Sequence, residues 1–209
     1  MITLDIFADP ICPWCLIGKA RLDRALEARP DHPFAIAWHP FQLDPSLPQG
    51  GMNRADYLEA KFGREGAVRI HVPVLDAAKE AGIEIDLAAI TRTPNTRDAH
   101  RLIHWAGLEG RQSAMIAALM RAYWREGRDI GDAAVLADLA AGVGLDREMI
   151  ARLLASDADC DTVATREEHA RSRGVRAVPT FVIANTHVIE GAQPTELWLR
   201  VIDDLAAQA

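Results

Sequence analysis

Apolar and polar residues alternate at the start of the chain. Residues 2–7 (ITLDIF) show this two-residue period, which predicts a strand. Residues 15–28 then carry apolar side chains at helical spacing, and Pro30 ends the predicted helix. Residues 34–41 are dense in apolar and aromatic side chains and predict a second strand. The chain is therefore expected to begin with a strand–helix–strand unit.

The pattern changes after this unit. From about residue 53 to residue 173 the apolar positions follow helical periods, with almost no strand signal. The clearest helix covers residues 115–124, whose methionine, leucine, isoleucine and aromatic side chains form one broad apolar stripe. Asp132 and Asp146 each precede a further apolar run and are predicted helix N-caps. The middle of the chain is therefore predicted to be helical.

The end of the chain returns to the first pattern. Residues 180–184 predict a strand, Asn185 and Thr186 a tight turn, and residues 187–190 a second strand. Pro194 is expected to open a final helix, because its fixed φ suits the first turn.

The predicted elements run β-α-β, helical block, β-β-α, which indicates an α/β fold. The α/β core is complete only when both ends of the chain meet. We therefore expect residues 1–45 and 174–209 to form one domain, with residues 46–173 as an inserted helical subdomain.

Composition excludes some classes of partner. The 209 residues include 30 acidic and 23 basic ones, a net charge of −7, and no Lys/Arg-rich run. Nucleic-acid binders normally present a basic face, so we expect no nucleic-acid partner. No segment approaches the length of a membrane-spanning helix, and the N-terminus lacks the basic region of a secretory signal. These features predict a cytoplasmic protein without a membrane partner.

Two cysteines separated by two residues stand at the start of the first predicted helix. Cys12 falls near the N-cap, where unpaired backbone N–H groups and the helix dipole stabilise a thiolate. Cys15 lies one turn further along, where a resolving thiol would stand. We predict that both are catalytic and form a redox-active disulfide without a bound cofactor. Pro13 and Trp14 between them carry no positive charge, so we expect a less strongly oxidising couple than with histidine there.

The cysteine pair has two other interpretations. A structural zinc site would need two more ligands, and Cys160 is the only other cysteine, so histidines would have to complete it. An accidental pair fits poorly with the strand-then-helix context. We favour redox chemistry and predict no metal site, with a non-catalytic or zinc-stabilised module as the hypothesis from a different class.

Val178 and Pro179 stand directly before the predicted strand at residue 180. A proline there can follow a cis peptide bond in a tight turn, although an ordinary trans proline is commoner. Alone, this feature leaves both interpretations open.

Taken together, the motifs resemble the DsbA-type thioredoxin fold, and more closely the cytosolic FrnE-like branch of that family. The resemblance covers nearly the whole chain and rests on residues 9–18 (DPICPWCLIG), 94–96 (PNT), 99–102 (AHRL), 123–135 (YWREGRDIGDAAV), 174–182 (GVRAVPTFV) and 191–194 (GAQP).

The resemblance implies a thioredoxin fold with a large all-helical insertion, and a cis Pro179 beside the cysteines. It implies that the backbone at Val178 binds an extended substrate segment as an added strand, with Pro13 and Trp14 also contacting substrate. The implied substrates are protein or small-molecule disulfides, exchanged by a disulfide oxidoreductase or isomerase.

The same superfamily supplies the alternative function. Kappa-type glutathione transferases and 2-hydroxychromene-2-carboxylate isomerases share the architecture and bind glutathione, but usually carry serine in place of Cys12. The two cysteines here favour disulfide exchange. A pocket between core and helices would still suit glutathione or a small aromatic substrate, so a glutathione-dependent isomerase or transferase is the alternative.

Other residues have simpler predicted roles. His100 and His104 have a spacing that can bind metal, but we interpret them as a helix face packed toward the core or cleft. Asn95 and Thr96 follow a proline and are interpreted as a capping signal, with one or the other as the N-cap, and lining of the cleft over Cys12 is the alternative.

Two tryptophans, Trp105 and Trp124, are predicted to be core aromatics of the insertion. Cys160 lies in an acidic segment, so we do not expect it to be a reactive partner for Cys12. His39, at the end of the second strand, is assigned no role.

Overall fold

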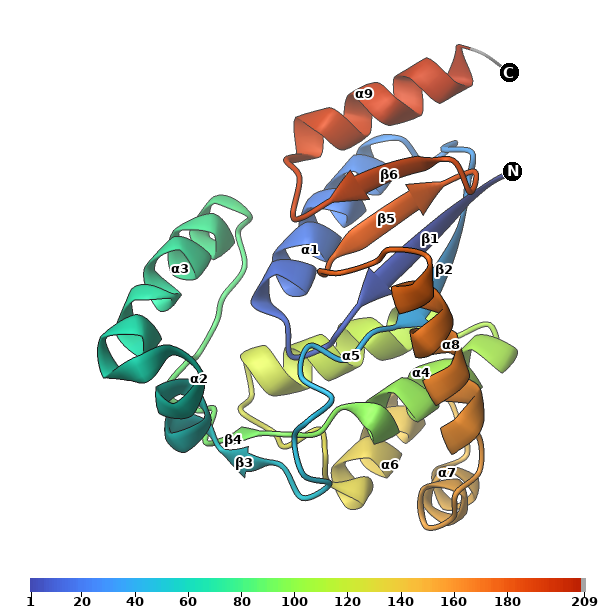
Figure 1. Ribbon diagram of the computed structural model, residues 1–209. Helices are drawn as coiled ribbons and strands as arrows, with labels where there is room; N and C mark the ends of the chain where they lie inside the picture. The colour runs from blue at the N-terminus through green and yellow to red at the C-terminus, as the bar shows by residue number, and fades with distance from the viewer. Residues whose placement is uncertain (208–209) are drawn as a thin grey trace.

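A four-stranded sheet joins the two ends of the chain. The structure is a computed structural model that describes residues 1–207. In sheet order the strands are β2 (Phe34–Pro40), β1 (Ile2–Ala8), β5 (Thr180–Ile183) and β6 (His187–Glu190). β1 pairs in parallel with β2 and antiparallel with β5, and β6 returns antiparallel to β5. The N-terminal strands therefore lie beside the C-terminal hairpin, as Figure 1 shows.

Two helices pack side by side on one face of this sheet, α1 (Pro13–Ala28) and α9 (Thr195–Ala206). Ile6 and its cross-strand partner Phe181 are fully buried. Phe181 packs edge-on against Trp198 of α9, with ring centroids 4.7 Å apart. This face forms the apolar core of the α/β part and holds α1 at a fixed position beside β1.

The segment between β2 and β5 is mostly helical. It contains α2 (Arg54–Arg69), α3 (His71–Glu80), α4 (Arg97–Leu108), α5 (Gln112–Trp124), α6 (Ala133–Gly142), α7 (Arg147–Leu154) and α8 (Cys160–Ser172). The exception to the expected all-helical insertion is a short antiparallel ladder between β3 (Met52–Asn53) and β4 (Arg92–Thr93). Strands of two residues are too short to leave an alternating pattern in the sequence.

Asp132 and Asp146 are the N-cap residues of α6 and α7, so both predicted aspartate caps are confirmed. Asp132 accepts hydrogen bonds from the backbone N–H groups of Ala134 and Val135, and Asp146 accepts one from Met149. These bonds satisfy N–H groups that the first turns of α6 and α7 would leave unpaired.

The C-terminal hairpin differs slightly from expectation. β5 ends at Ile183 rather than Ala184, because Ala184 adopts a φ of 51° and leaves the extended conformation. Asn185 also has positive φ, at 58°, and the N–H of Thr186 closes the turn onto the Ile183 carbonyl at 3.0 Å. Asparagine tolerates this left-handed conformation better than most residues.

No helix among residues 1–207 is long and apolar enough to cross a membrane.

Candidate active site

Cys12 is the N-cap residue of α1, and Pro13 takes the first helical position. A turn after β1 places Cys12 at the helix start, and the turn is closed by the Cys12 N–H, which donates to the Asp9 carbonyl at 3.0 Å. The Cys12 carbonyl then accepts the N–H groups of Cys15 and Leu16 at 3.1 and 3.2 Å, which starts the helix. Both cysteines are free thiols. Cys12 thus stands where the unpaired N–H groups of the first turn converge.

The loop before β5 reaches the same point from the far end of the sequence. The peptide bond between Val178 and Pro179 is cis. The Cys12 thiol donates a hydrogen bond to the Val178 carbonyl oxygen, with Sγ and O 3.5 Å apart. Gly18 allows this approach, since a Cβ at Gly18 would lie 3.1 Å from Pro179 Cγ. The fold therefore brings the predicted cysteines and the Val178–Pro179 turn together.

The predicted site residues differ in exposure. Cys12 and Cys15 expose 2% and 1% of their surface, whereas Trp14 between them exposes 37%. Burial raises the pKa of the Cys15 thiol well above its ordinary value, and the neighbouring Cys12 raises it further. A hydrogen bond with the Asp9 backbone lowers the Cys15 pKa, whereas the negative charge of the Asp9 carboxylate raises it. Cys15 is consequently a protonated thiol at neutral pH.

Asp9 is a site residue that the sequence reasoning treated only as part of a motif. Its carboxyl is fully buried and accepts hydrogen bonds from the N–H of Ile11 (3.2 Å), the N–H of Leu43 (2.6 Å) and the hydroxyl of Thr96 (3.1 Å). Burial outweighs these bonds and raises the pKa of Asp9 to about 7. Its position three residues before Cys12 is the sequence signal that could have identified it.

His100 lies against this carboxyl on α4. It exposes 3% of its surface, and its Nε2 lies 3.9 Å from Asp9 Oδ1. Burial lowers the pKa of His100 to about 3, with a smaller contribution from Arg166, so the imidazole is neutral. The pair is therefore not an ion pair, and 3.9 Å is too long for a direct hydrogen bond. The prediction that His100 packs inward is confirmed.

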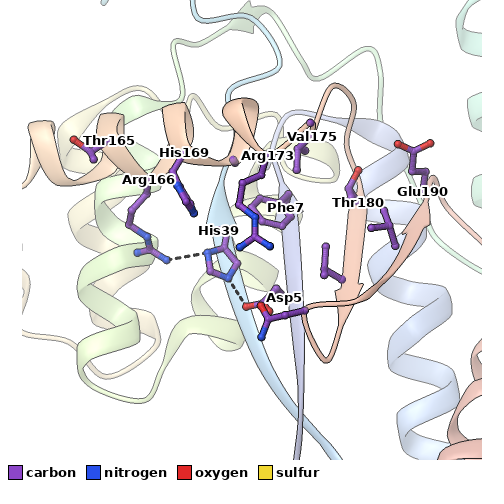
Figure 2. A pocket seen from close by; sticks show the side chains of 15 residues that line it. Asp5, Phe7, His39, Thr165, Arg166, His169, Arg173, Val175, Thr180 and Glu190 are labelled. Carbon is purple, nitrogen blue, oxygen red and sulfur yellow. Dashed lines mark hydrogen bonds and ion pairs between the residues drawn. The ribbon is translucent and has the colours of Figure 1, made fainter.

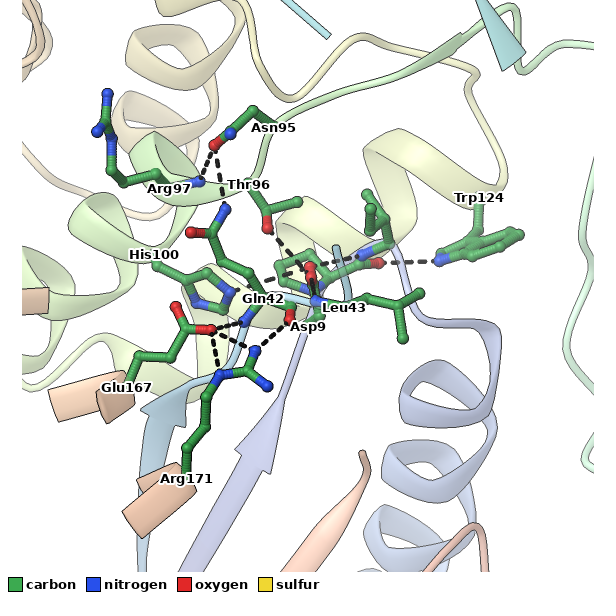
Figure 3. Close-up of polar contacts among 12 residues, drawn as sticks. Asp9, Gln42, Leu43, Asn95, Thr96, Arg97, His100, Trp124, Glu167 and Arg171 are labelled. Atoms are coloured by element: carbon green, nitrogen blue, oxygen red, sulfur yellow. Dashed lines mark hydrogen bonds and ion pairs between the residues drawn. The ribbon is translucent and has the colours of Figure 1, made fainter. Parts of the chain in front are cut away.

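The residues around Asp9 form a polar network that joins the α/β part to the insertion (Figure 3). Thr96, one of the two predicted N-cap candidates, is the N-cap residue of α4, but its hydroxyl makes no cap bond and instead donates to Asp9. Asn95 does cap α4, accepting the Arg97 N–H at 3.0 Å, and also accepts from the Gln42 side chain at 3.1 Å. The network thus fixes the loop after β2 against the start of α4.

A second part of this network involves Glu167 and Arg171 of α8. The Glu167 carboxylate accepts the Gln42 N–H at 3.0 Å and pairs with Arg171 at 2.6 Å. Arg171 also donates to the Gln42 carbonyl at 2.8 Å. Glu167 also raises the pKa of Asp9 through its charge.

The two tryptophans are buried, as predicted. Trp105 exposes 5% of its surface and Trp124 exposes 2%. Trp124 also has a specific role, because its Nε1–H donates to the Pro10 carbonyl at 2.9 Å and holds the loop before Cys12. Cys160 begins α8 and is partly exposed.

Among residues 1–207, no three His, Cys, Asp or Glu side chains converge in a way that could hold a metal ion. His104 lies 3.8 Å from Asp159, and His39 lies 2.7 Å from Asp5. Both histidines therefore belong to other contacts, apart from the cysteines.

Comparison with known proteins agrees with this geometry. A probable DsbA oxidoreductase from Streptomyces coelicolor is 30% identical and superposes with a TM-score of 0.88, covering 100% of this chain and 92% of that one. A 2-hydroxychromene-2-carboxylate isomerase is 18% identical with a TM-score of 0.74, covering 99% and 98%. The cytosolic disulfide reductase DsbM from Pseudomonas aeruginosa, solved with GSH, is 22% identical with a TM-score of 0.67, covering 98% and 99%.

The last two similarities show the shared fold alone. The decisive match is to the family described as DSBA-like thioredoxin domain, over residues 3–203. The chain belongs to this family of DsbA-like thioredoxin proteins.

Proposed function

We propose that this protein is a cytosolic thiol–disulfide oxidoreductase or isomerase of the FrnE-like branch, with Cys12 as the attacking thiol and Cys15 as the resolving thiol. The observation that carries the proposal is the position of Cys12, at the N-cap of α1 and 3.5 Å from the Val178 carbonyl. The helix start stabilises a thiolate, and the loop offers backbone groups to a substrate.

The first step exchanges one hydrogen bond for another. In the free protein the Val178 carbonyl accepts a hydrogen bond from the Cys12 thiol. An extended substrate segment beside this loop would donate a backbone N–H to the same carbonyl, which frees the thiol to lose its proton to solvent water. The Cys12 thiolate then attacks one sulfur of the substrate disulfide. A mixed disulfide forms, and the other substrate sulfur leaves as a thiolate.

The second step needs a proton acceptor for Cys15, whose thiol pKa is raised by burial. Asp9 is suited to this role because its own pKa, about 7, lies near neutral pH. After Asp9 takes the proton, the Cys15 thiolate attacks Cys12 Sγ. The Cys12–Cys15 disulfide forms, and the second substrate sulfur leaves as a thiolate. The substrate gains two electrons, and the protein is oxidised.

Substrate recognition is assigned to Pro13, Trp14, Val178 and Pro179. Trp14 is the exposed member, and its ring offers an apolar surface beside the cysteines. We propose protein or small-molecule disulfides as substrates and glutathione as a candidate co-substrate. The reducing poise of the cytosol favours reduction or isomerisation over net oxidation.

A redox titration with mass labelling of thiols tests the proposal. The protein is equilibrated at a series of reduced-to-oxidised glutathione ratios, and unreacted thiols are alkylated and weighed. We expect one intramolecular disulfide between Cys12 and Cys15, absent in Cys12→Ser and Cys15→Ser, while Cys160→Ser behaves as the natural protein. If the pair stays reduced at every ratio, the proposal is wrong.

The alternative is a glutathione-dependent isomerase or transferase acting on a small aromatic compound. It is supported by the fold shared with the isomerase and with the reductase solved with GSH. Turnover of an aromatic substrate that needs glutathione and survives Cys15→Ser would favour this alternative. Capture of mixed-disulfide partners by Cys15→Ser would favour disulfide exchange. Stoichiometric zinc in the purified protein would favour a non-catalytic module instead.

A further inference from the structure

A cavity of about 510 Å³ lies away from the cysteines, on the sheet face opposite α1 and α9. Its floor consists of side chains that strand alternation directs to this face: Asp5, Phe7, His39, Thr180, Val182 and Val188. Phe7 and His39 stack with ring centroids 4.9 Å apart, and Val188 is 60% exposed. The volume is within the range of small-molecule sites, and the floor is largely apolar.

The opposite wall is one side of α8, and it is basic. Arg166, His169 and Arg173 line the cavity at intervals of three and four residues. Figure 2 shows these side chains projecting from α8 toward His39 and Phe7. None of the ion pairs found among residues 1–207 involves Arg166 or Arg173. The two guanidinium groups therefore carry uncompensated positive charge beside an apolar floor.

The position of Arg166 is fixed by neutral groups. It donates to Nδ1 of His39 at 3.3 Å, to Nδ1 of His104 at 3.2 Å and to the Trp38 carbonyl at 3.4 Å. A guanidinium only donates, so both Nδ1 atoms accept, and each imidazole carries its proton on Nε2. Burial, together with Arg166, lowers the pKa of both histidines, which agrees with neutral rings.

The carboxylates near the cavity do not cancel this charge. Asp5 accepts from His39 Nε2 at 2.7 Å and is engaged there. Glu190 lies on β6, on the other side of the cavity from Arg166 in Figure 2. The anion-binding end is thus the α8 side, and the apolar end lies over Val182 and Val188.

We propose that this cavity binds a small organic anion, with a carboxylate or sulfonate on Arg166 and Arg173 and an apolar, ring-sized body over Phe7 and the two valines. Arg166 is held in place by its histidine partners before any ligand arrives, so little side-chain entropy is lost on binding. The site does not include the cysteines, and it stands independently of the proposed redox function.

The test uses 2-naphthoate as the probe and 2-naphthamide as its uncharged match, each titrated into the full chain by calorimetry. We expect naphthoate to bind and naphthamide to bind about tenfold more weakly, the effect of losing a charge-assisted hydrogen bond. Arg166→Gln and, separately, the more exposed Arg173→Gln should each weaken naphthoate binding about tenfold. Arg200→Gln on α9, which removes the same charge from the opposite face, is the matched control and should bind normally.

Cys12→Ser should also bind naphthoate normally, because the cavity does not contain the thiol. The proposal is overturned if naphthoate and naphthamide bind equally, if both arginine variants retain full affinity, or if Arg200→Gln weakens binding as much as they do. Loss of binding in Cys12→Ser would place the ligand at the cysteines instead. A dimer in sedimentation that excludes naphthoate would show that a second copy covers this face, and would also overturn the proposal.

Discussion

The carboxyl of Asp9 and the imidazole of His100 face each other inside the protein, with Oδ1 and Nε2 3.9 Å apart. Burial acts on both groups and disfavours the charged form of each, raising the pKa of Asp9 to about 7 and lowering that of His100 to about 3. Between about pH 3 and pH 7 both groups are mainly neutral. The site therefore holds a carboxyl that can gain or lose a proton near neutral pH and whose charge acts on the Cys15 thiol.

Asp9→Asn is expected to change how stability depends on pH. In the unfolded chain an aspartate has a pKa of about 3.9, whereas folded Asp9 titrates at about 7. Between these values the folded protein holds a proton that the unfolded chain lacks, so this contribution to stability is full below about pH 4 and is lost as pH rises through 7. Asparagine removes this dependence.

Urea unfolding at several pH values, with a thiol-free reductant present, measures the effect. The free energy of unfolding of Asp9→Asn relative to the natural protein should rise by a few kcal/mol, to order of magnitude, between about pH 4 and pH 8. His100 has the opposite dependence, because its lowered pKa removes stability as pH falls below about 6.5. Because His100 is present in both proteins, its contribution largely cancels in the difference between their free energies of unfolding. A difference that stays constant with pH would contradict the assignment for Asp9.

The same variant is expected to slow resolution of the mixed disulfide. If Asp9 accepts the Cys15 proton, its loss should reduce the rate of this step about a hundredfold above pH 7, within the range for general bases. The first attack by Cys12 should change much less. Rapid acid quench and mass analysis would show the mixed disulfide accumulating, and the rate inflection near pH 7 should disappear.

Asp146→Asn is the matched control, because asparagine also caps a helix and α7 lies outside the site. Resolution at the natural rate in Asp9→Asn, with the inflection near pH 7 retained, would exclude Asp9 as the proton acceptor.

Much of the α/β part could be predicted because its signals are local. The alternation of residues 2–7, the proline at the first turn of α1 and the turn residues near Asn185 each act within a few positions. The Asp9 site could not be derived in this way. Its partners Leu43 and Thr96 come from a loop and a helix start far along the chain, and only the fold shows that they meet.

Thr96 is the N-cap residue of α4, as the capping signal predicted, but its side chain makes no cap hydrogen bond, for a related reason. Threonine before a helix normally bonds an N–H of the first turn. Here the buried carboxyl of Asp9 competes for the hydroxyl, and Asn95 supplies the cap bond. Sequence spacing cannot reveal a competitor from another segment. The same holds for Arg166, whose histidine partners come from β2 and α4.

Arg101→Met is expected to destabilise the insertion strongly. Arg101 exposes 1% of its surface and donates to three backbone carbonyls and one carboxylate, those of Leu153, Ser156, Ala158 and Asp98. Methionine would remove all four of these part-buried hydrogen bonds and the charge that pairs with Asp98. We expect a loss of about 3–5 kcal/mol in the free energy of unfolding, measured by urea titration.

Arg147→Met provides the comparison, because Arg147 forms an exposed ion pair with Asp138 at 2.7 Å. Such pairs contribute at most about 1 kcal/mol. Equal losses in the two variants would show that the buried bonds of Arg101 have no special weight.

Gly18→Val is expected to separate the loop from the cysteines. A Cβ at Gly18 would lie 3.1 Å from Pro179 Cγ, 3.4 Å from the Cα of Ala192 and 3.5 Å from the ring of Phe181. The two methyl groups of valine add to this crowding, so Pro179 must shift and the Cys12–Val178 contact must lengthen. Overpacking of this kind costs about 1–3 kcal/mol. We expect that loss in urea unfolding, together with slower reaction of the reduced protein with a peptide disulfide.

Gly142→Val is the control, because nothing lies within 4 Å of a Cβ at Gly142 near the end of α6. The Gly142→Val protein should change in stability only through helix propensity at this position, and it should react with the peptide disulfide at the natural rate. If Gly18→Val reacts as fast as this control, the packing of α1 against Pro179 does not set the geometry of the Cys12 thiol.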